Sequence, residues 1–216
     1  VDRIASRLDG DYELMFNGVE VQRFASAEPW PTDGPTVLFV GRHEPRKGLD
    51  VLLGALEELP AEVRIWVAGT GPDTDALQAR FTDERIEWLG RIDDHERDRR
   101  LAGADVFCAP SLGGESFGVI LLEAMAARTP VVASDIPGYT KVATAPAPDG
   151  SVPPEPAALL APVGDAAALA DRLRRVLGDP AEAARQRDLG WERVQPFDVE
   201  RLTDLYLQRY HQLVAG

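Results

Sequence analysis

The sequence contains very little cysteine and almost no lysine. Cys108 is the single cysteine among 216 residues, which excludes an intrachain disulfide and a metal cluster built on several cysteines. Of the 23 basic residues, only Lys47 and Lys141 are lysines, and the others are arginines. Because a compact ammonium group differs from a guanidinium in shape and hydration, each lysine of this chain is a candidate for a specific role.

Long apolar runs and an excess of positive charge are also absent. No apolar run approaches the ~18 residues of a membrane-spanning helix, and the first residues lack the layout of a signal peptide. Acidic residues outnumber basic ones by 36 to 23, and the net charge of −13 disfavours DNA, RNA and anionic lipid surfaces as partners. An apolar content of 44% is typical of a globular domain with a full core. We therefore expect a cytoplasmic protein, and a start at Val1 rather than Met indicates part of a longer one.

Short apolar runs alternate with segments of helical periodicity along most of the chain. The runs are rich in valine and isoleucine, which is typical of buried strands. We predict strands at Thr36–Val40, Val63–Ala68, Arg85–Leu89, Asp105–Ala109, Val131–Ser134 and Leu159–Pro162. We predict helices at Leu49–Leu59, Asp75–Phe81, Asp94–Leu101, Val119–Arg128 and Ala166–Leu177. The alternation predicts an α/β, Rossmann-like fold with a parallel six-stranded sheet and helices on both faces.

Two segments near the carboxyl end depart from this alternation. Ala143–Ala158 holds five of the 17 prolines and predicts a surface loop. The segment from Pro180 to Val214 has no strand signal and predicts two consecutive helices, broken near Pro196. Because a fold of this kind binds ligands at the carboxyl ends of its strands, the residues after each strand are the candidates for a site.

Cationic residues follow the first predicted strand, in the segment Gly41–Gly48. Arg42 and Lys47 precede a predicted helix, whose first amides add a partial positive charge. Such a cluster suits a diphosphate. The alternative is a solvated loop in which the cations pair with Glu44 and Asp50. The scarcity of lysine in the chain favours the first interpretation.

A partial glycine pattern follows the second predicted strand. Gly69 and Gly71 form only the first part of a dinucleotide-binding fingerprint, and a tight turn between strand and helix explains them equally well. Asp73 and Asp75 have the spacing with which some sugar-transferring enzymes hold a divalent metal. We expect the segment Asp73–Asp75 instead to cap the helix, with an aspartate near the first turn accepting from its free amides, and we predict no metal there.

Glycines surround Glu115 in the segment after the fourth predicted strand, and an apolar helix begins after Gly118. The exposed amides at the start of that helix are suited to phosphate oxygens. Glu123 lies on this helix among apolar neighbours, so we expect a buried carboxylate that needs a partner, such as ligand hydroxyls. Two carboxylates with this spacing can hold two hydroxylated parts of one ligand.

Together these motifs resemble the donor-binding half of a retaining glycosyltransferase with the GT-B fold, in family 4 (glycosyl transferases group 1). The amino-acid sequence is most similar to that of the phosphatidylinositol mannosyltransferases, as in the segments GRHEPRKGLDVLL and ESFGVILLEAMAARTPVVASDIPG. Asn17–Glu20 resembles the family's linker between its two domains. The resemblance rests mainly on Gly41-Arg42, Lys47-Gly48, Gly69–Pro72, Gly90–Ile92, and on Glu115 and Glu123 with seven residues between them.

The resemblance implies a reaction and three catalytic residues. A sugar would be displaced from a nucleoside diphosphate with retention at its anomeric carbon. Arg42 and Lys47 would hold the diphosphate, and Glu115 would contact the donor sugar. The implied donor is GDP-mannose or a UDP-sugar, and the acceptor is a lipid or a glycan.

The resemblance also implies how the rest of the donor is bound. Glu123 would hold the ribose hydroxyls, and the backbone of Arg91 and Ile92 would lie against the base. The remaining donor-binding positions are the glycines of the first two loops and the amides before and within the apolar helix, namely Gly41, Gly69, Gly71, Phe117, Gly118, Val119 and Ile120. No metal and no cofactor besides the donor are implied.

Members of the family have two domains, and the first supplies the acceptor site. We therefore predict a linker region at residues 1–24 and a single nucleotide-sugar-binding domain at residues 25–216, which binds nucleotide but does not transfer sugar without the missing N-terminal domain. Nucleic acid is not an expected partner, and any membrane contact would be made by the missing domain. The complete protein is then cytoplasmic, with a peripheral position at the inner face of the membrane left open.

Two other functions remain as alternatives at this stage. One is a stand-alone nucleotide-binding or regulatory module without transfer activity. The other is a dehydrogenase-type dinucleotide binder, which the incomplete glycine fingerprint disfavours.

Several polar residues do not enter these predictions. His43 and His95 stand in charged loops, and no two histidines have metal-ligand spacing. The charged run from Asp93 to Arg100 predicts a capped, solvated helix start. Ser116 has no adjacent histidine, which argues against a hydrolase triad.

Overall fold

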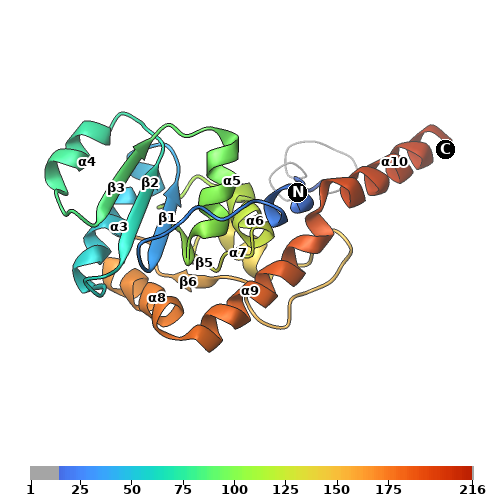
Figure 1. Ribbon diagram of the computed structural model, residues 1–216. Coiled ribbons are helices and arrows are strands. Elements are labelled where there is room, and N and C mark those ends of the chain that lie inside the picture. Colours follow the sequence, from blue (N-terminus) through green and yellow to red (C-terminus); the bar gives the residue numbers. More distant parts are fainter. Residues whose placement is uncertain (1–14, 216) are drawn as a thin grey trace.

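The six predicted strands form one sheet in the computed structural model, which describes residues 15–215 (Figure 1). The strands are β1 (Thr36–Val40), β2 (Arg64–Ala68), β3 (Ile86–Gly90), β4 (Val106–Ala109), β5 (Val131–Ser134) and β6 (Leu159–Ala161). They pair in the order β3-β2-β1-β4-β5-β6, and every pair is parallel. The chain changes direction across the sheet between β1 and β4, and ligands of open α/β sheets bind at such a reversal.

Helices connect the strands and cover both faces of the sheet. They are α2 (Val21–Ala25), α3 (Leu49–Ala55), α4 (Thr74–Arg80), α5 (Asp94–Gly103), α6 (Val119–Ala126), α7 (Pro137–Thr144), α8 (Ala166–Gly178), α9 (Pro180–Val194) and α10 (Val199–Ala215). Short 3₁₀ turns lie at Pro45–Lys47, Leu56–Glu58 and Gln195–Phe197. The predicted fold class is thereby confirmed, including the two helices that end the chain.

The side chains of each strand divide the core into two clusters. Successive residues of a strand point to opposite faces. Val37 and Phe39 of β1 therefore pack with α3 and α8, whereas Leu38 packs with α2, α5, α6 and α7. All three are at most 2% exposed. Because both faces are covered, the strands have continuous apolar sequences rather than alternating ones.

Helix α7 is not predicted from the sequence, and neither is the five-residue α2. The glycine and threonines of α7 are poor helix formers, so periodicity and propensity give little signal. Helix α7 begins with Pro137, whose fixed φ suits a first helical position, and it buries Tyr139 and Val142 in the core. The predicted loop at Ala143–Ala158 is consequently wrong at its start, because its first two residues complete α7.

The segment that leads into α2 pairs with the segment that leads into α10. Val19 pairs with Asp198 in a parallel bridge, the amide of Val19 donates to the carbonyl of Phe197 (2.9 Å), and the amide of Val199 donates to the carbonyl of Val19 (3.0 Å). Directly after this bridge, α2 buries Val21 and Phe24 in the core. A linker at residues 1–24 stays a prediction, and its first 14 residues lie outside the described part.

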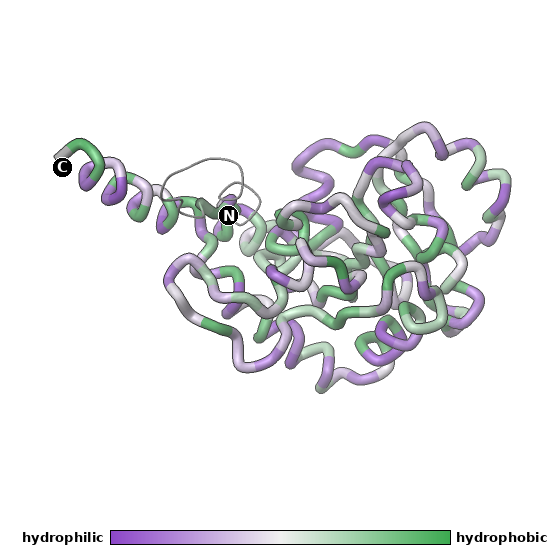
Figure 2. The backbone as a smooth tube through the Cα atoms, turned by 180° about the vertical axis from the view of Figure 1, so that it is seen from behind, coloured by the Kyte–Doolittle hydropathy of each residue, from purple (hydrophilic) through white to green (hydrophobic). Residues whose placement is uncertain are grey.

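Helix α10 projects away from the rest of the molecule (Figure 1). Figure 2 shows hydrophobic and hydrophilic residues alternating along it. Its exposed apolar side chains include Leu207 (49%), Tyr210 (58%) and Leu213 (64%). The first half of the helix is anchored by Leu202, which is 3% exposed, and by the hydroxyl of Tyr206, which donates to the carbonyl of Phe16.

Candidate functional site

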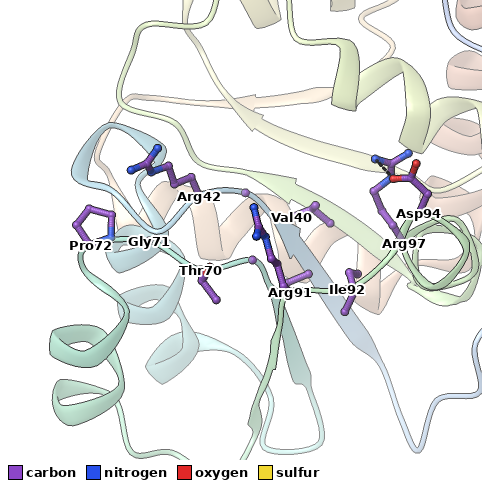
Figure 3. Close-up of a pocket in the computed structure, with 12 residues that line it drawn as sticks. Val40, Arg42, Thr70, Gly71, Pro72, Arg91, Ile92, Asp94 and Arg97 are labelled. Atoms are coloured by element: carbon purple, nitrogen blue, oxygen red, sulfur yellow. Dashed lines mark ion pairs between the residues drawn. The ribbon is translucent and has the colours of Figure 1, made fainter.

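A cleft of about 710 Å³ opens at the carboxyl ends of β1, β2 and β3 (Figure 3). Loops after these three strands and the first turn of α5 form its walls. Six residues predicted for the site meet here, namely Gly41, Arg42, Gly69, Gly71, Arg91 and Ile92. Thr70, Pro72, Asp94 and Arg97 also line it, although none of these was singled out in the sequence as a site residue.

Gly69 and Gly71 allow the loops after β1 and β2 to touch. A Cβ atom on Gly69 would lie 2.0 Å from the carbonyl oxygen of Gly41, and one on Gly71 would lie 2.2 Å from that of His43. Gly69 also has a φ of 118°, which L-residues rarely adopt. The amide of Asp73 donates to the carbonyl of His43 (3.1 Å), which holds the two loops together. The packing between these loops is thus enough to require both glycines.

The aspartate cap predicted for the segment Asp73–Asp75 is not formed by Asp73. Asp73 stands at the N-cap position, but its carboxylate makes no capping hydrogen bond. The hydroxyl of Thr74 accepts from the amide of Gly71 instead (2.9 Å) and lies 2.9 Å from Nδ1 of His43. A threonine one position later therefore organises the turn.

His43 is buried rather than placed in a solvated loop. It is 1% exposed, and its ring packs edge-on against Trp88. Burial lowers the pKa of His43, although the nearby Asp73 carboxylate opposes the shift. A neutral His43 at physiological pH follows from this burial.

A second group of predicted residues lies in the loops after β1 and β4. Oε1 of Glu115 accepts from Nζ of Lys47 (2.6 Å) and from Nη1 of Arg46 (2.9 Å). The Lys47 and Glu115 side chains are 20% and 16% exposed. The two loops approach closely because Gly48 packs directly against the carbonyl of Pro110. The cations of this segment do pair with Glu44, as the solvated-loop alternative expects, but only through Arg42 (3.6 Å) and Arg46 (2.7 Å).

The amino end of α6 lies after the Glu115 loop. Gly118 has a φ of 92° and forms the N-cap of α6 without a side-chain hydrogen bond. Within residues 15–215, the amides of Gly118, Val119 and Ile120 donate to no acceptor. The Phe117 side chain packs instead on Phe16 and Phe197, with ring centroids 6.0 and 5.7 Å away.

Glu123 has the burial predicted for it, and its partner is Arg97. Its side chain is 17% exposed, and Oε2 lies 3.9 Å from Nε of Arg97. Burial raises the pKa of the Glu123 carboxyl, and the Arg97 charge partly opposes this. Arg97 lines the cleft and also pairs with Asp94 (3.2 Å), as Figure 3 shows. Glu123 is therefore coupled to the cleft through Arg97.

The charged run that contains Arg97 is solvated only at its start, where Asp93 and Asp94 are exposed. Asp93 caps α5 as predicted, accepting from the amide of Glu96 (2.8 Å). Asp98, however, is 7% exposed and accepts from Nε of Arg23 (2.7 Å). The guanidinium of Arg100 lies 4.3 Å from the ring centroids of both Trp30 and Trp66. No signal within the run indicates this burial, because Trp30 and Trp66 are distant from it in sequence.

Metal ligands and the lone cysteine complete the inventory of reactive groups. Among the described residues, no group of three or more His, Cys, Asp or Glu side chains is arranged to hold a metal ion. Cys108 is fully buried, and burial raises the pKa of its thiol. It acts as a small apolar side chain of β4.

The model of the family "Glycosyl transferases group 1" matches residues 34–179. The chain belongs to this family. Phosphatidyl-myo-inositol mannosyltransferase of Mycobacterium leprae is 43% identical to it over 97% of this chain and 56% of the relative. The enzyme of the same name from Mycolicibacterium smegmatis is 41% identical, over 97% of this chain and 54% of the relative. The chain thus spans about half the length of the curated relatives it matches.

Solved structures agree with the GT-B glycosyltransferase fold. Sucrose-phosphate synthase of Thermosynechococcus elongatus superposes with a TM-score of 0.80 at 30% identity, covering 96% of this chain and 54% of that one. HepE of Anabaena, solved in complex with UDP-glucose, superposes with a TM-score of 0.77 at 20% identity, covering 93% and 57%. The family resemblance is therefore confirmed. Within the described part of this glycosyl transferases group 1 chain, no helix is both long and apolar enough to cross a membrane.

Proposed function

We propose that this chain is the donor-binding domain of a retaining hexosyltransferase that uses GDP-mannose or a UDP-sugar. The observation that carries the proposal is the cleft at the carboxyl ends of β1, β2 and β3, lined by Arg42, Arg91 and Arg97 on a protein of net charge −13. A local cationic site on an acidic chain suits a small anion and not an extended one.

The diphosphate is held at the junction of two loops in this proposal. Arg42 and Lys47 come from the loop after β1, and the unused amides of Gly118, Val119 and Ile120 point from the start of α6. These groups stabilise the charge that develops on the leaving diphosphate when the bond to the sugar breaks. The electron pair of that bond goes to the diphosphate. The oxygen of the acceptor hydroxyl bonds to the anomeric carbon on the same face, and the hydroxyl proton passes to the departing diphosphate oxygen.

The nucleoside is held along the cleft. The Glu123 carboxylate accepts hydrogen bonds from the two ribose hydroxyls, which supply the polar partners that a buried carboxylate requires. The backbone of Arg91 and Ile92 lies against the base. Arg97, 3.9 Å from Glu123, favours the ionised carboxylate that can accept from both hydroxyls.

The sugar and the acceptor are proposed from the relatives. Both curated relatives above are named as phosphatidyl-myo-inositol mannosyltransferases, which supports mannose as the sugar and a lipid as the acceptor. The acceptor site is assigned to an N-terminal domain outside this chain. The complete enzyme is then cytoplasmic or peripheral to the membrane, and membrane contact belongs to the missing domain.

Calorimetric titration of the chain with GDP, UDP and ADP tests the proposal. We expect saturable binding of GDP or UDP, and weaker binding of ADP and NADH. No metal is expected to be needed, so the affinity is predicted to be the same with EDTA as with Mg²⁺. Absence of binding by all of these nucleotides at millimolar concentration would reject the proposal.

A transfer assay separates the proposed function from its alternative. The isolated chain is expected to bind nucleotide without transferring sugar, and joined to the N-terminal domain encoded with it the protein should convert GDP-mannose or a UDP-sugar to GDP or UDP. A stand-alone or regulatory nucleotide-binding module would bind the nucleotide equally well. Such a module, joined to the N-terminal domain, would release no nucleoside diphosphate from a sugar nucleotide with any acceptor.

A further inference from the structure

One carboxylate oxygen of Glu115 holds two cations of the proposed diphosphate site. Oε1 accepts from Nζ of Lys47 at 2.6 Å and from Nη1 of Arg46 at 2.9 Å. The Lys47–Glu115 pair is largely withdrawn from water, because the side chains are 20% and 16% exposed. A pair with these distances and this burial is stronger than an ordinary surface ion pair.

Most of the positive charge at this site is compensated before a ligand arrives. Glu44 forms an ion pair with Arg46, with 2.7 Å between Oε1 and Nε, and a weaker one with Arg42, with 3.6 Å between Oε2 and Nε. Only Arg42 is both weakly paired and well exposed, at 68%. A diphosphate that binds Lys47 therefore competes with Glu115 for the ammonium group.

The free-energy cost of this competition depends on whether the diphosphate carries a sugar. A sugar brings hydroxyl groups that donate to Glu115 and replace the lost ammonium hydrogen bond. A free nucleoside diphosphate instead places an additional ionisable phosphate oxygen where the sugar stood. Glu115 then loses Lys47 and faces a like charge, which is unfavourable.

We propose that Glu115 determines the preference of this site for a sugar-bearing nucleotide over the free nucleoside diphosphate. This inference rests on the proposed function. While a donor sugar is bound, Glu115 accepts from its hydroxyls and Lys47 is free to hold the diphosphate. After transfer, Glu115 returns to Lys47 and Arg46, and this competition speeds release of the product. Substituting Glu115 should thus strengthen binding of the product and weaken catalysis.

Titration of the Glu115→Gln variant with two matched ligands tests the inference. Glutamine keeps the size of the side chain but removes its charge. The dissociation constants of GDP and GDP-mannose, or of UDP and UDP-glucose if the base is uracil, are measured for both chains by calorimetry. We expect the variant to bind the free diphosphate about fivefold more tightly, which is the effect of losing roughly 1 kcal/mol of competing ion-pair energy. Binding of the sugar nucleotide should be unchanged or weaker.

Glu44→Gln is the matched control. It removes a carboxylate from the same cluster, but Glu44 pairs with Arg42 and Arg46 and not with Lys47. Both ligands should bind this variant more tightly by the same factor, so the ratio of the two dissociation constants should stay at its original value. Thermal unfolding of each variant verifies that the fold is retained.

The possible outcomes separate this inference from the proposed function. If the original chain binds the nucleotides but Glu115→Gln leaves the ratio of the two dissociation constants unchanged, the inference is overturned and the proposed function stands. Equal weakening of both ligands in Glu115→Gln would have the same meaning. If the original chain binds none of the four nucleotides, the proposed function fails and the inference fails with it.

Discussion

The hydroxyl of Tyr139 lies 2.9 Å from the hydroxyl of Ser111, and both side chains are buried. Ser111 begins the loop that carries Glu115, and the Tyr139 ring also packs beneath Gly118, where a Cβ atom would lie 2.7 Å from Cδ1. The preceding residue, Gly138, packs against the carbonyl of Glu115. Helix α7 therefore supports this loop at its start, its middle and its end.

Tyr139→Phe is expected to weaken both the fold and nucleotide binding. The change leaves the buried Ser111 hydroxyl without its partner, which costs about 1–2 kcal/mol of the free energy of unfolding. A loosened loop should also bind GDP or UDP less tightly. Urea unfolding and calorimetry measure the two effects. The double variant Ser111→Ala, Tyr139→Phe removes the unsatisfied hydroxyl and should recover part of the stability. A double variant that loses more free energy of unfolding than the two single variants together would contradict this account.

Lys47→Ala should reduce nucleotide binding far more than stability. The variant removes a charge-assisted contact to the diphosphate, so we expect a loss of roughly tenfold or more in affinity, and in the complete enzyme a larger loss in kcat. Stability should change by less than about 1 kcal/mol, because Arg46 remains beside Glu115. The matched control is Lys141→Ala, at the other lysine of the chain, which should leave affinity unchanged. Equal affinities for both variants would remove Lys47 from the site.

Glu123→Gln should stabilise the chain while weakening nucleotide binding. Burial raises the pKa of Glu123, so the native state binds a proton more tightly than the unfolded state, and ionisation at neutral pH lowers the stability. Glutamine removes that cost, and we expect a gain of about 0.5–2 kcal/mol at pH 7 that shrinks as the pH falls toward 4.5. Thermal unfolding across this pH range measures it. A variant that loses stability at pH 7, or binds nucleotide as tightly as the original chain, would argue against the assigned role.

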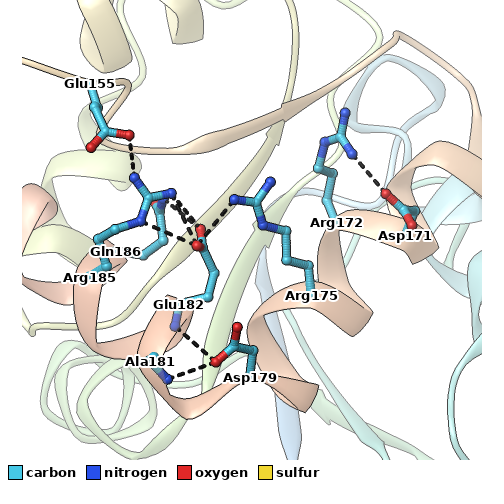
Figure 4. Close-up of polar contacts among 9 residues, drawn as sticks. All are labelled: Glu155, Asp171, Arg172, Arg175, Asp179, Ala181, Glu182, Arg185 and Gln186. Carbon is cyan, nitrogen blue, oxygen red and sulfur yellow. Dashed lines mark hydrogen bonds and ion pairs between the residues drawn. The ribbon is translucent and has the colours of Figure 1, made fainter.

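Glu182 should contribute stability that disappears in acid. Its buried carboxylate accepts from Arg185 (2.9 Å), Gln186 (3.1 Å) and Arg175 (3.1 Å), as Figure 4 shows. The hydrogen bonds from Arg185, followed by those from Gln186 and Arg175, lower the pKa of Glu182, although burial opposes the shift. The stabilisation is therefore complete above the unfolded pKa near 4.5 and is lost as the pH falls through the lower folded value.

The measurement for Glu182 compares Glu182→Gln with the original chain between pH 7 and pH 3. We expect a loss of about 1–3 kcal/mol at pH 7 and a smaller difference below pH 4. Glu155→Gln is the control, because Glu155 pairs with the same arginine but is 57% exposed, and exposed pairs contribute little. If the stability difference between Glu182→Gln and the original chain grows in acid, the predicted direction of the pH dependence is wrong.

The strands were predictable because buried parallel strands have continuous apolar sequences that end where the sheet ends. All six strands lie within two residues of their predicted bounds, and the loops that follow them converge on one edge. Helix α7 was not predictable in this way. Its residues favour a helix only once Tyr139 and Val142 are buried against α6, which is information about packing rather than about local sequence.

Charged residues were harder to assign than apolar ones. The run from Asp93 to Arg100 has the composition of a solvated helix, yet Arg100 is enclosed between two tryptophans that are distant in sequence. Arg97 could not be assigned from the sequence for the same reason, because its partner Glu123 lies on another helix. Lys47 stands out in the sequence because lysine is scarce in the chain, whereas Arg46 is one arginine among many.

The bridge between Val19 and Asp198 determines how the domain would respond to mechanical force. Tension applied between residue 15 and the end of α10 would reach this bridge before the six-stranded sheet, since the two hydrogen bonds of Val19 join the incoming and outgoing segments. Because the bridge is parallel, those two bonds would be loaded in shear and would resist together rather than open one after the other. The sheet and the cleft at its edge would bear the force only after this bridge had broken.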